Sequence, residues 1–350
     1  MDALCNCIEP AALIGHFASF PPCDFHPLQL DSAPAFETNF DLLTTLDGPL
    51  RRFVRAVPLV SRLAHARTVF VGTTVSEYAL LPAGLDAASF ARQLASAGAW
   101  PFVIIKDLPA EPLLVGEDSF RQSERLMAAG VEAGFVPVEG QALAYVRIDF
   151  SSIDELLARF SHARRKNVRR KLRSRETLTI EDLPFGDTRF DDALVARIYE
   201  LYLNVYRQSE LRFDLLTQPF FMAVVRDPAI SGFVTLYRLD EDLIAFNLCV
   251  TNNGLLIDKY IGLDYPAATD ANVYTVSWFH NLQRCLELGL RCYVAGWTDP
   301  DVKRSLGARF TMTRHLVYAR NPLLRAALRL LHRFFESDAN WAAHVATGDS

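Results

Sequence analysis

The stretch LIAFNLCVTNNGLLIDKYIGLDY, residues 243–265, decides the fold of this chain. It holds two apolar runs separated by Asn252-Asn253-Gly254, and Asn-Gly between such runs is a strong signal for a tight hairpin turn. A third run, SGFVTLYRL (231–239), comes before it across the polar tip 240–242. The sequence therefore predicts three consecutive antiparallel strands.

Helix and strand signals alternate after this hairpin. A helix is expected from about Asn272 to Leu288, ended by Gly289, and then the strand LRCYVAGW (290–297). A short connection leads to a last strand, MTRHLVYAR (312–320). The second half thus combines a hairpin sheet with a helix and two further strands.

The first half has its own alternation of elements. Strand, helix, strand, helix and strand are predicted at 66–81, 86–98, 100–109, 119–133 and 142–150. Asp86 and Gly98 mark both ends of the first helix, since Asp caps N-termini and Gly ends helices. This order describes one α/β unit.

Between the halves lies SSIDELLARFSHARRKNVRRKLRSRE, residues 151–176. Ser152 and Glu155 have capping-box spacing, which predicts one helix running to about Arg175. An apolar stripe that includes Val168 would face the core while the cations point outward. Eight cations follow one another without an acid: Arg164, Arg165, Lys166, Arg169, Arg170, Lys171, Arg173 and Arg175.

Two interpretations of this basic helix stay open. It would suit a phosphate-bearing ligand, such as a CoA pyrophosphate, a nucleotide-sugar acceptor or an RNA backbone. It would also suit a solvated face whose arginines pair with the acidic remainder of the chain.

Composition narrows the class of protein. The chain has 350 residues, half of them hydrophobic, and a net charge of −5. That charge excludes a globally basic nucleic-acid binder. We see neither an apolar run of membrane-spanning length nor a signal peptide, and expect a cytoplasmic protein. The predicted organisation is an irregular segment (1–48), a first domain that includes the basic helix (49–176), a second domain (177–336) and a frayed tail (337–350).

Cysteine spacing gives no metal site. Cys5, Cys7 and Cys23 lie near two histidines, but their spacing fits no zinc pattern, so we interpret them as reduced thiols and expect no metal. Cys249, Cys285 and Cys292 stand in apolar segments and are predicted to be core residues.

The second half, with a helix pair, a hairpin sheet, then helix, strand, turn and strand, resembles the GNAT acyltransferase superfamily. More narrowly, the chain resembles the FemAB-like branch, which has two tandem GNAT-like halves. The basic helix, the hairpin 243–265 and Lys303-Arg304-Ser305-Leu306-Gly307 carry the resemblance, which covers about residues 49–335.

The resemblance implies a mixed α/β (α+β) fold of two GNAT-like domains joined by the basic helix. It also implies transfer of an acyl or aminoacyl group from acyl-CoA or aminoacyl-tRNA to the amine of a small molecule or peptide. The alternative class is a non-catalytic binding module whose basic helix holds RNA or an anionic lipid.

One departure from the superfamily concerns the donor. GNAT domains that bind acetyl-CoA have a Gly-rich loop whose backbone N–H groups hold the pyrophosphate. Residues 265–275, YPAATDANVYT, contain no glycine, so the close backbone approach that glycine permits is missing. This counts against acetyl-CoA and leaves room for the aminoacyl-tRNA that Fem-type enzymes use.

Acyl transfer to an amine needs a positioned donor, a neutral amine and a group that stabilises the oxyanion. Strand alternation puts Asp258, Tyr260 and Gly262 on one face. Tyr260 is our candidate acid or carbonyl ligand, and Asp264 our candidate proton acceptor. Each has a structural alternative, since Tyr260 suits an ordinary strand surface and Asp264 suits a turn cap before Pro266.

Binding roles are predicted for two further sets. Donor or phosphate contacts are expected from Arg164, Arg165, Lys166, Arg169, Arg170, Lys171, Arg173, Lys303 and Arg304. An acceptor pocket is expected from Thr73, Thr74, Glu77, Tyr78, Lys259, Tyr274, Trp297 and Asp299. Solvated turns are the alternative for both sets, and we interpret His162, His280 and His315 as structural.

The last helix, residues 322–336, has a broad apolar face with arginines opposite. Packing on the domain is the commoner use of such a helix. Contact with an anionic membrane surface is the alternative.

Overall fold

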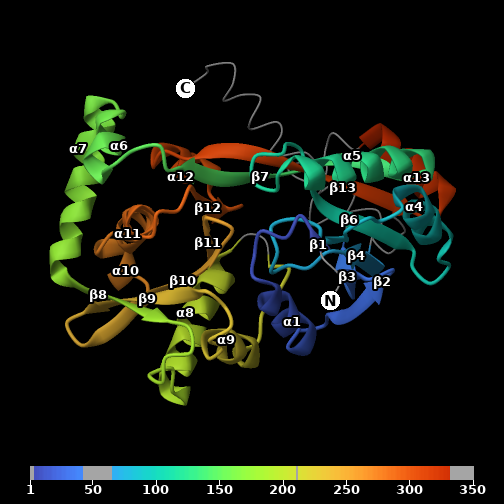
Figure 1. Cartoon of the computed structure of the whole chain (residues 1–350). Helices are drawn as coiled ribbons and strands as arrows, with labels where there is room; N and C mark the ends of the chain where they lie inside the picture. The colour runs from blue at the N-terminus through green and yellow to red at the C-terminus, as the bar shows by residue number, and fades with distance from the viewer. Residues whose placement is uncertain (1–3, 42–64, 210–211, 332–350) are drawn as a thin grey trace. The chain divides into compact units, whose positions relative to one another are not determined.

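The computed structural model describes residues 4–41, 65–209 and 212–331. The chain divides into two compact units (Figure 1). Unit 1 comprises Met1–Ile8, Asp24–Ala142 and Thr311–Ser350, and unit 2 comprises Glu9–Cys23 and Leu143–Phe310. Unit 2 thus begins upstream of the boundary that we predicted at residue 176. The basic helix is part of unit 2 and not a linker between two domains, which corrects that expectation.

Unit 1 is a mixed sheet with helices. Its strands are β2 (His26–Leu30), β3 (Ala33–Asp41), β4 (His65–Val71), β6 (Phe102–Pro109) and β13 (Arg309–Ala319). The pairs β2–β3, β3–β4 and β6–β13 are antiparallel, while β4 and β6 are parallel. Its remaining elements are β1 (Leu4–Cys5), β5 (Leu81–Pro82), α4 (Ala87–Ser96), α5 (Glu117–Glu132) and α13 (Pro322–Leu331).

The cap predicted at Asp86 is confirmed. Its carboxylate accepts hydrogen bonds from the backbone N–H groups of Ala88 and Ser89, which are first-turn donors without a helical partner. The buried face of α4 places Phe90 and Leu94 on the core of unit 1.

Unit 2 is built on β8 (Leu178–Pro184), β9 (Gly232–Leu239), β10 (Asp242–Asn252) and β11 (Leu255–Leu263), which pair antiparallel in chain order. β12 (Cys292–Gly296) is parallel to β11 and antiparallel to the last residues of β7 (Val136–Arg147). The helices are α1 (Ala11–Ser19), α6 (Ile153–Ala158), α7 (His162–Leu172), α8 (Asp192–Gln208), α9 (Gln218–Val225), α10 (Ala267–Asp270), α11 (Val273–Glu287) and α12 (Pro300–Ser305), with a 3₁₀ turn at Arg173–Thr177.

Helices cover both faces of the unit 2 sheet. Phe246 of β10 contacts Phe221 of α9, whereas its neighbour Asn247 bonds Asn281 of α11. Since successive strand residues point to opposite faces, α8 and α9 lie on one face and α10 and α11 on the other (Figure 1).

The hairpin predicted at Asn252–Gly254 is confirmed. Asn252 pairs with Leu255, and the two residues between them, Asn253 and Gly254, have φ of 49° and 74°. Two positive φ values define the turn type that matches the twist of the flanking strands, and Asn and Gly adopt them at low cost.

The prediction of one helix from Ser152 to Arg175 is wrong. The predicted cap is present, because Ser152 accepts from the Glu155 N–H, but α6 ends at Ala158. Phe160 is buried, and Ser161 then caps a new helix, α7, by accepting from the Arg164 N–H. A second strong cap directly after a buried aromatic residue interrupts the helix.

Cys249, Cys285 and Cys292 are buried, as predicted. In α13, Leu323 and Leu330 are 79% and 81% exposed, and Arg325 lies over the Tyr318 ring. The rest of the predicted C-terminal helix and the tail 337–350 lie outside the described residues. Whether this helix packs on the domain or contacts a membrane stays a prediction. Within the described ranges, no helix has the length and apolar character needed to cross a membrane.

Gly262 provides a test of packing in unit 2. A Cβ atom there would collide with the Phe246 ring and lie 2.8 Å from the Leu201 backbone carbon. We expect Gly262→Ala to lower the free energy of unfolding by about 1–3 kcal/mol, because neither neighbour has space to move. Urea unfolding measures this. Gly15→Ala in α1 is the control, since nothing lies near its Cβ, and an equal loss in both variants would contradict the prediction.

Candidate active site

Two parallel strands of unit 2 diverge where β12 ends. β11 and β12 pair at Leu255–Ile257 and Cys292–Val294, and β11 then continues to Leu263 along β10. The backbone therefore stops bridging the two strands at Asp258. Residues 258–263 and 295–297, which border this divergence, are the frame of the candidate site.

A β-bulge in β11 sits at this point. Leu248 pairs with Tyr260 and Cys249 with Asp258, so Lys259 is an extra residue in the strand. The bulge reverses the side-chain alternation that we predicted. Asp258 points toward α11, while Tyr260 points toward α8 and α9, where its ring meets those of Tyr202, Phe220 and Phe221. The two side chains are not on one face.

Asp258 is held by three neutral donors. Asn247 Nδ2 donates to Oδ1 at 2.6 Å, while the Tyr293 hydroxyl at 2.7 Å and Asn281 Nδ2 at 3.3 Å donate to Oδ2. Burial, together with the charge of Asp258, raises the pKa of the Tyr293 phenol well above its ordinary value. The phenol therefore stays protonated and keeps donating. The carboxylate is partly exposed and fixed in direction.

The charge of Asp258 acts on Tyr274, and the charge of Asp299 acts on both Tyr274 and Tyr265. Burial raises the pKa of the Tyr274 phenol, and the charges of Asp258 and then Asp299 raise it further. Burial and the charge of Asp299 likewise raise the pKa of Tyr265. Tyr274, in the first turn of α11, thus lies within the field of two carboxylates. Asp299 is exposed and Trp297 half-buried at the end of β12.

Lys303 brings a buried ammonium to the same place. The residue is 4% exposed and belongs to α12. A side chain at Gly296 would have Lys303 Nζ and the Asp258 carbonyl oxygen each 3.9 Å from its Cβ. Lys303 therefore reaches the divergence from the β12 side, whereas its neighbour Arg304 is exposed.

The basic helix divides into structural and exposed cations. Arg164 stacks on Phe160, 3.6 Å from the ring centre, and donates to the carbonyls of Ser305 and Arg304 at 2.5 and 2.9 Å. It thereby caps the C-terminus of α12. Arg169 forms an ion pair with Asp154 at 2.9 Å. Within the part of the chain that the structure describes, this is the one ion pair made by residues 164–175.

The exposed cations form a stripe. Lys166 and Arg170 of α7 and Arg173, the residue directly after it, are exposed and follow each other at spacings of four and three residues, which places them along one face; we call them the α7 stripe. Val168 is buried on the core side.

The segment after β11 does not fit a pyrophosphate as a Gly-rich loop does. The backbone N–H groups of residues 268–272 donate in turn to the carbonyls of Asp264, Pro266, Pro266, Ala267 and Thr269. Five successive amides are thus used within the segment itself, three of them in α10 and two directly after it. Backbone donors already bonded at short range are not free to hold an anion.

Asp264 lies in an ion pair. Its carboxylate is 2.5 Å from a guanidinium nitrogen of Arg197, which also donates to the Leu243 carbonyl. This arrangement ties α8 to the end of β11. The catalytic roles of Tyr260 and Asp264 stay predictions.

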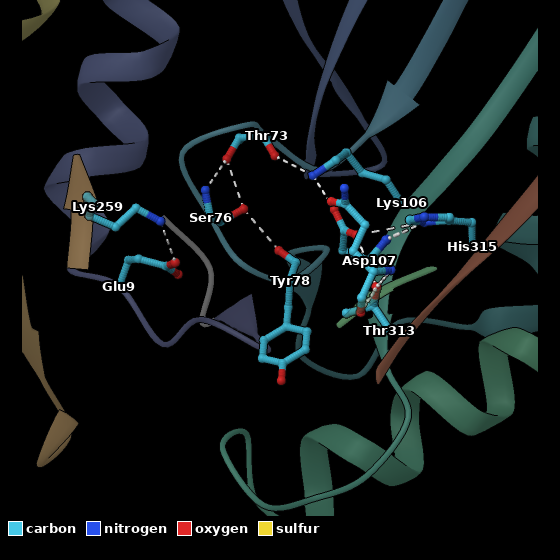
Figure 2. Close-up of polar contacts among 10 residues, drawn as sticks. Glu9, Thr73, Ser76, Tyr78, Lys106, Asp107, Lys259, Thr313 and His315 are labelled. Atoms are coloured by element: carbon cyan, nitrogen blue, oxygen red, sulfur yellow. Dashed lines mark hydrogen bonds and ion pairs between the residues drawn. The ribbon is translucent and has the colours of Figure 1, made fainter. Parts of the chain in front are cut away.

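Lys259 lies in a buried ion pair. Its ammonium is 3.3 Å from Glu9 Oε1, and the two side chains are 5% and 0% exposed (Figure 2). The bulge turns Lys259 to the face opposite Asp258. The structure therefore places this predicted acceptor residue in the interior and not at the divergence.

The acceptor residues predicted in unit 1 fold inward. Thr73, Glu77 and Tyr78 are 1–3% exposed. Ser76 bonds the Thr73 hydroxyl at 2.8 Å and the Tyr78 carbonyl at 2.9 Å (Figure 2). Thr74 is half-buried beside them. Thr73, Ser76 and the Tyr78 carbonyl thus bond one another in the chain after β4.

A polar cluster in unit 1 was missed by the sequence analysis. Lys106 pairs with Asp107 and donates to the Thr73 carbonyl, and Thr313 donates to Asp107 at 3.2 Å (Figure 2). His315 Nδ1 accepts from the Asp107 N–H at 2.9 Å. Burial would raise the pKa of Asp107, but these neighbours, Lys106 first, hold that pKa below its ordinary value. β6 and β13 are over 200 residues apart in the sequence, so no spacing of residues could predict the cluster.

A contact between His280 and Asp182 was also not predicted from the sequence. His280 Nε2 lies 2.9 Å from Asp182. Burial would raise the pKa of Asp182, but its interactions with His280, Thr235 and Arg284 hold that pKa below its ordinary value. In the described ranges no three His, Cys, Asp or Glu side chains gather as a metal site would need, and all six cysteines are unbridged.

Comparison with known families gives a match within unit 2. Residues 162–304, beginning at the first residue of α7, match the family described as Acetyltransferase (GNAT) domain. No curated protein matches. Residues 162–304 are thus similar to a GNAT acyltransferase domain, in agreement with the resemblance noted in the sequence.

Solved structures extend the likeness to both units. The C-terminal domain of a putative lysylphosphatidylglycerol synthetase from Agrobacterium fabrum is 13% identical, covering 93% of this chain and 92% of that one, with a TM-score of 0.57. L-PGS from Bacillus licheniformis is 10% identical, covering 94% of this chain and 97% of that one, with a TM-score of 0.55. FemX is 12% identical, covering 91% of this chain and 98% of that one, with a TM-score of 0.50. The fold of this chain is similar to those of the three structures.

His315 makes unit 1 sensitive to acid. Burial lowers the pKa of His315, so the folded state keeps it neutral where the unfolded chain binds a proton. Stability is therefore lost as pH falls below about 6.5, the ordinary His pKa. We expect the thermal midpoint to fall between pH 7.5 and 5.5, and less steeply in His315→Asn, which keeps an acceptor for the Asp107 N–H.

The control is His26→Asn, because His26 is exposed on β2 of the same unit. Its thermal midpoint should follow pH as the unmodified protein's does. Equal pH slopes for His315→Asn and the unmodified protein would contradict the prediction.

Proposed function

We propose that this acyltransferase moves an aminoacyl group from aminoacyl-tRNA to an amine, and that the divergence of β11 and β12 is where the amide forms. The observation that carries the proposal is the self-bonded segment 268–272. Five amides engaged with nearby carbonyls leave a CoA pyrophosphate without the backbone cradle that acetyl-CoA enzymes of this superfamily use. A donor held by side chains outside this segment fits better.

The exposed stripe of α7 supplies such side chains. Lys166, Arg170 and Arg173 are cations on an acidic protein, and a polyanion is the ligand that gains from such an arrangement. RNA presents phosphates along its whole length, so it can contact this stripe and also reach the divergence in the same unit. A CoA molecule carries its phosphates at one end only.

Names of structural neighbours agree with an aminoacyl donor. The neighbour from Agrobacterium fabrum is named as a domain of a putative lysylphosphatidylglycerol synthetase, a name that refers to a product with a lysyl group. The FemAB-like resemblance implies aminoacyl-tRNA as the donor. At 10–13% identity this likeness supports the fold, and the donor rests on the α7 stripe and the segment 268–272.

The chemistry needs few groups. The amine nitrogen attacks the ester carbonyl carbon, the carbonyl oxygen gains negative charge, and the ribose oxygen leaves with a proton as the amide forms. Lys303, buried beside Gly296, is the cation best placed to stabilise that oxyanion. An aminoacyl ester is already activated, so no covalent enzyme intermediate is required.

A donor assay tests the proposal. The purified protein is incubated with total tRNA charged with labelled amino acids, or with labelled acetyl-CoA, and with glycylglycine, lysine and ethanolamine as acceptors. We expect a labelled product with charged tRNA that is abolished by prior RNase treatment and is stable to mild alkali, because amides resist conditions that cleave esters.

RNase-resistant transfer from acetyl-CoA would overturn the tRNA donor and leave an acyltransferase. Tight RNA binding with no transfer from either donor would favour the non-catalytic binding module.

The α7 stripe makes a separate prediction. Replacing Lys166, Arg170 and Arg173 together with alanine should weaken tRNA binding and reduce the slope of log K against log salt by about 2–3, since three phosphate contacts are lost. Filter binding from 50 to 300 mM salt measures the slope.

The matched control replaces three exposed cations of unit 1 helices, Arg92, Arg121 and Arg125, and leaves net charge equal to that of the stripe variant. A general electrostatic attraction would lower both slopes alike, which would contradict a specific role for α7.

A further inference from the structure

The end of α12 is held by side chains from two other helices of unit 2. Arg164 of α7 donates to the carbonyls of Arg304 and Ser305 at 2.9 and 2.5 Å. The indole N–H of Trp278, in α11, donates to the next carbonyl, that of Leu306, at 3.1 Å. Because the last carbonyls of a helix have no partner within it, donors of this kind stabilise a helix end. Three successive carbonyls at the end of α12 therefore depend on two side chains from elsewhere.

The guanidinium of Arg164 has little freedom. Its Cζ lies 3.6 Å from the centre of the Phe160 ring, and Phe160 is buried. The chain that leaves α12 comes close to both side chains: a Cβ atom at Gly307 would lie 3.1 Å from the Phe160 ring and 3.8 Å from an Arg164 nitrogen. Gly307 has φ of 102°, a conformation that glycine adopts at low cost. Arg164 is thus fixed by an aromatic ring and by the backbone after α12.

α7 itself gains nothing from a cation at this position. Arg164 belongs to the first turn of α7, where the helix dipole favours negative charge, and that turn contains no acid. Burial, and then the charge of Arg304, lowers the pKa of the Arg164 guanidinium, so both disfavour its charged form. The contacts that favour a charged Arg164 are those that it makes with α12.

α12 needs these contacts because it is short. It has six residues, and no side chain caps its first turn. A helix of this length is not stable by itself. Lys303 lies in α12 directly before Arg304, and its Nζ is 3.9 Å from the position that a Cβ would take at Gly296. The hydrogen bonds at residues 304–306 therefore determine where the Lys303 ammonium lies beside the divergence of β11 and β12.

We infer that Arg164 is a positioning residue for acyl transfer, because by capping α12 it holds Lys303 where the carbonyl oxygen of the donor gains charge. The inference rests on the proposed function and deepens it. It gives the basic segment two separate roles, since the α7 stripe binds the donor whereas Arg164 contacts no donor and acts through α12. Both roles belong to one helix, so a donor bound along α7 is also set in place relative to Lys303.

Lysine labelling tests this role without any substrate. The protein is treated with limiting acetic anhydride, and peptide mass spectrometry gives a rate for each lysine. Lys303 is 4% exposed and should react at least about tenfold more slowly than the exposed Lys166, because a buried amine reacts only after local opening. In Arg164→Met, Lys303 should react about tenfold faster than in the unmodified protein, since the end of α12 loses two charge-assisted hydrogen bonds. The rates of Lys106 and Lys259 should not change.

Arg159→Met is the matched control. Arg159 also lies over a phenylalanine ring, that of Phe150 at 5.7 Å, but it pairs with Asp149 and Glu155 instead of bonding α12. Lys303 should react in this variant as it does in the unmodified protein. Thermal midpoints of all variants report whether the fold is intact.

Transfer kinetics with charged tRNA test the same role in the reaction. Arg164→Met should lower kcat at least about tenfold and leave KM for the tRNA within about twofold, because a misplaced cation affects the transition state and not donor binding. Arg164→Lys keeps the charge but lacks the planar fork that reaches two carbonyls, so it should restore kcat only in part. An arginine that binds a tRNA phosphate would instead raise KM when it is replaced by methionine, and lysine would restore it.

The outcomes separate this inference from the proposed function. Unchanged Lys303 labelling in a folded Arg164→Met variant overturns the inference. An equal rise at Lys106 and Lys259, or the same rise in Arg159→Met, also overturns it, because it indicates a general loosening of the fold. A raised KM with unchanged kcat returns Arg164 to donor binding. If charged tRNA supports no transfer, the proposed function fails whatever the labelling shows, and the labelling alone then decides whether Arg164 positions Lys303.

Discussion

The single extra residue in β11 is the constraint on which the rest of the site depends. Without the bulge at Lys259, Asp258 and Tyr260 would share a face and one of them would be misplaced. The bulge instead lets Tyr260 and Gly262 pack against α8 and α9 while Asp258 faces α11. It also lies two residues beyond Ile257, the last residue of β11 that pairs with β12. A charged side chain is thereby delivered to the strand divergence from an otherwise buried hairpin.

A pair of parallel strands is found in each unit, β4 with β6 in unit 1 and β11 with β12 in unit 2, and the two pairs are used differently. In unit 1, the chain after β4 is buried, and Lys106 is bound to Asp107 and the Thr73 carbonyl. In unit 2, Asp258 and Lys303 border the diverging strands and remain next to partly exposed residues. The same local architecture serves as a packed polar core in one half and as a site in the other. The matched GNAT domain, residues 162–304, falls in the second.

Local signals predicted much of the fold. The Asn-Gly turn, the Asp86 cap and the Ser152 cap each depend on neighbours within three residues, and all are confirmed. The single basic helix was wrong, because the burial of Phe160 in the core and the cap at Ser161 break it. Of the candidate site, Lys303, Tyr274 and Asp299 had been singled out. The tethering of Asp264 by Arg197, 67 residues earlier, had no local signal.

By itself the sequence determined the hairpin, most helices and strands after residue 65, the resemblance to an acyltransferase superfamily and the lack of glycine after β11, but not the strands β2 and β3 in the segment that we predicted to be irregular. These properties follow from residue types at short spacing. Only tertiary structure decided that Asp258 and not Lys259 faces the divergence, that Arg164 caps α12, and that the amides of 268–272 bond one another. Register, burial and backbone pairing depend on contacts between distant segments. The alternation of hydrophobic and polar residues in a single sequence does not indicate where a strand has a bulge.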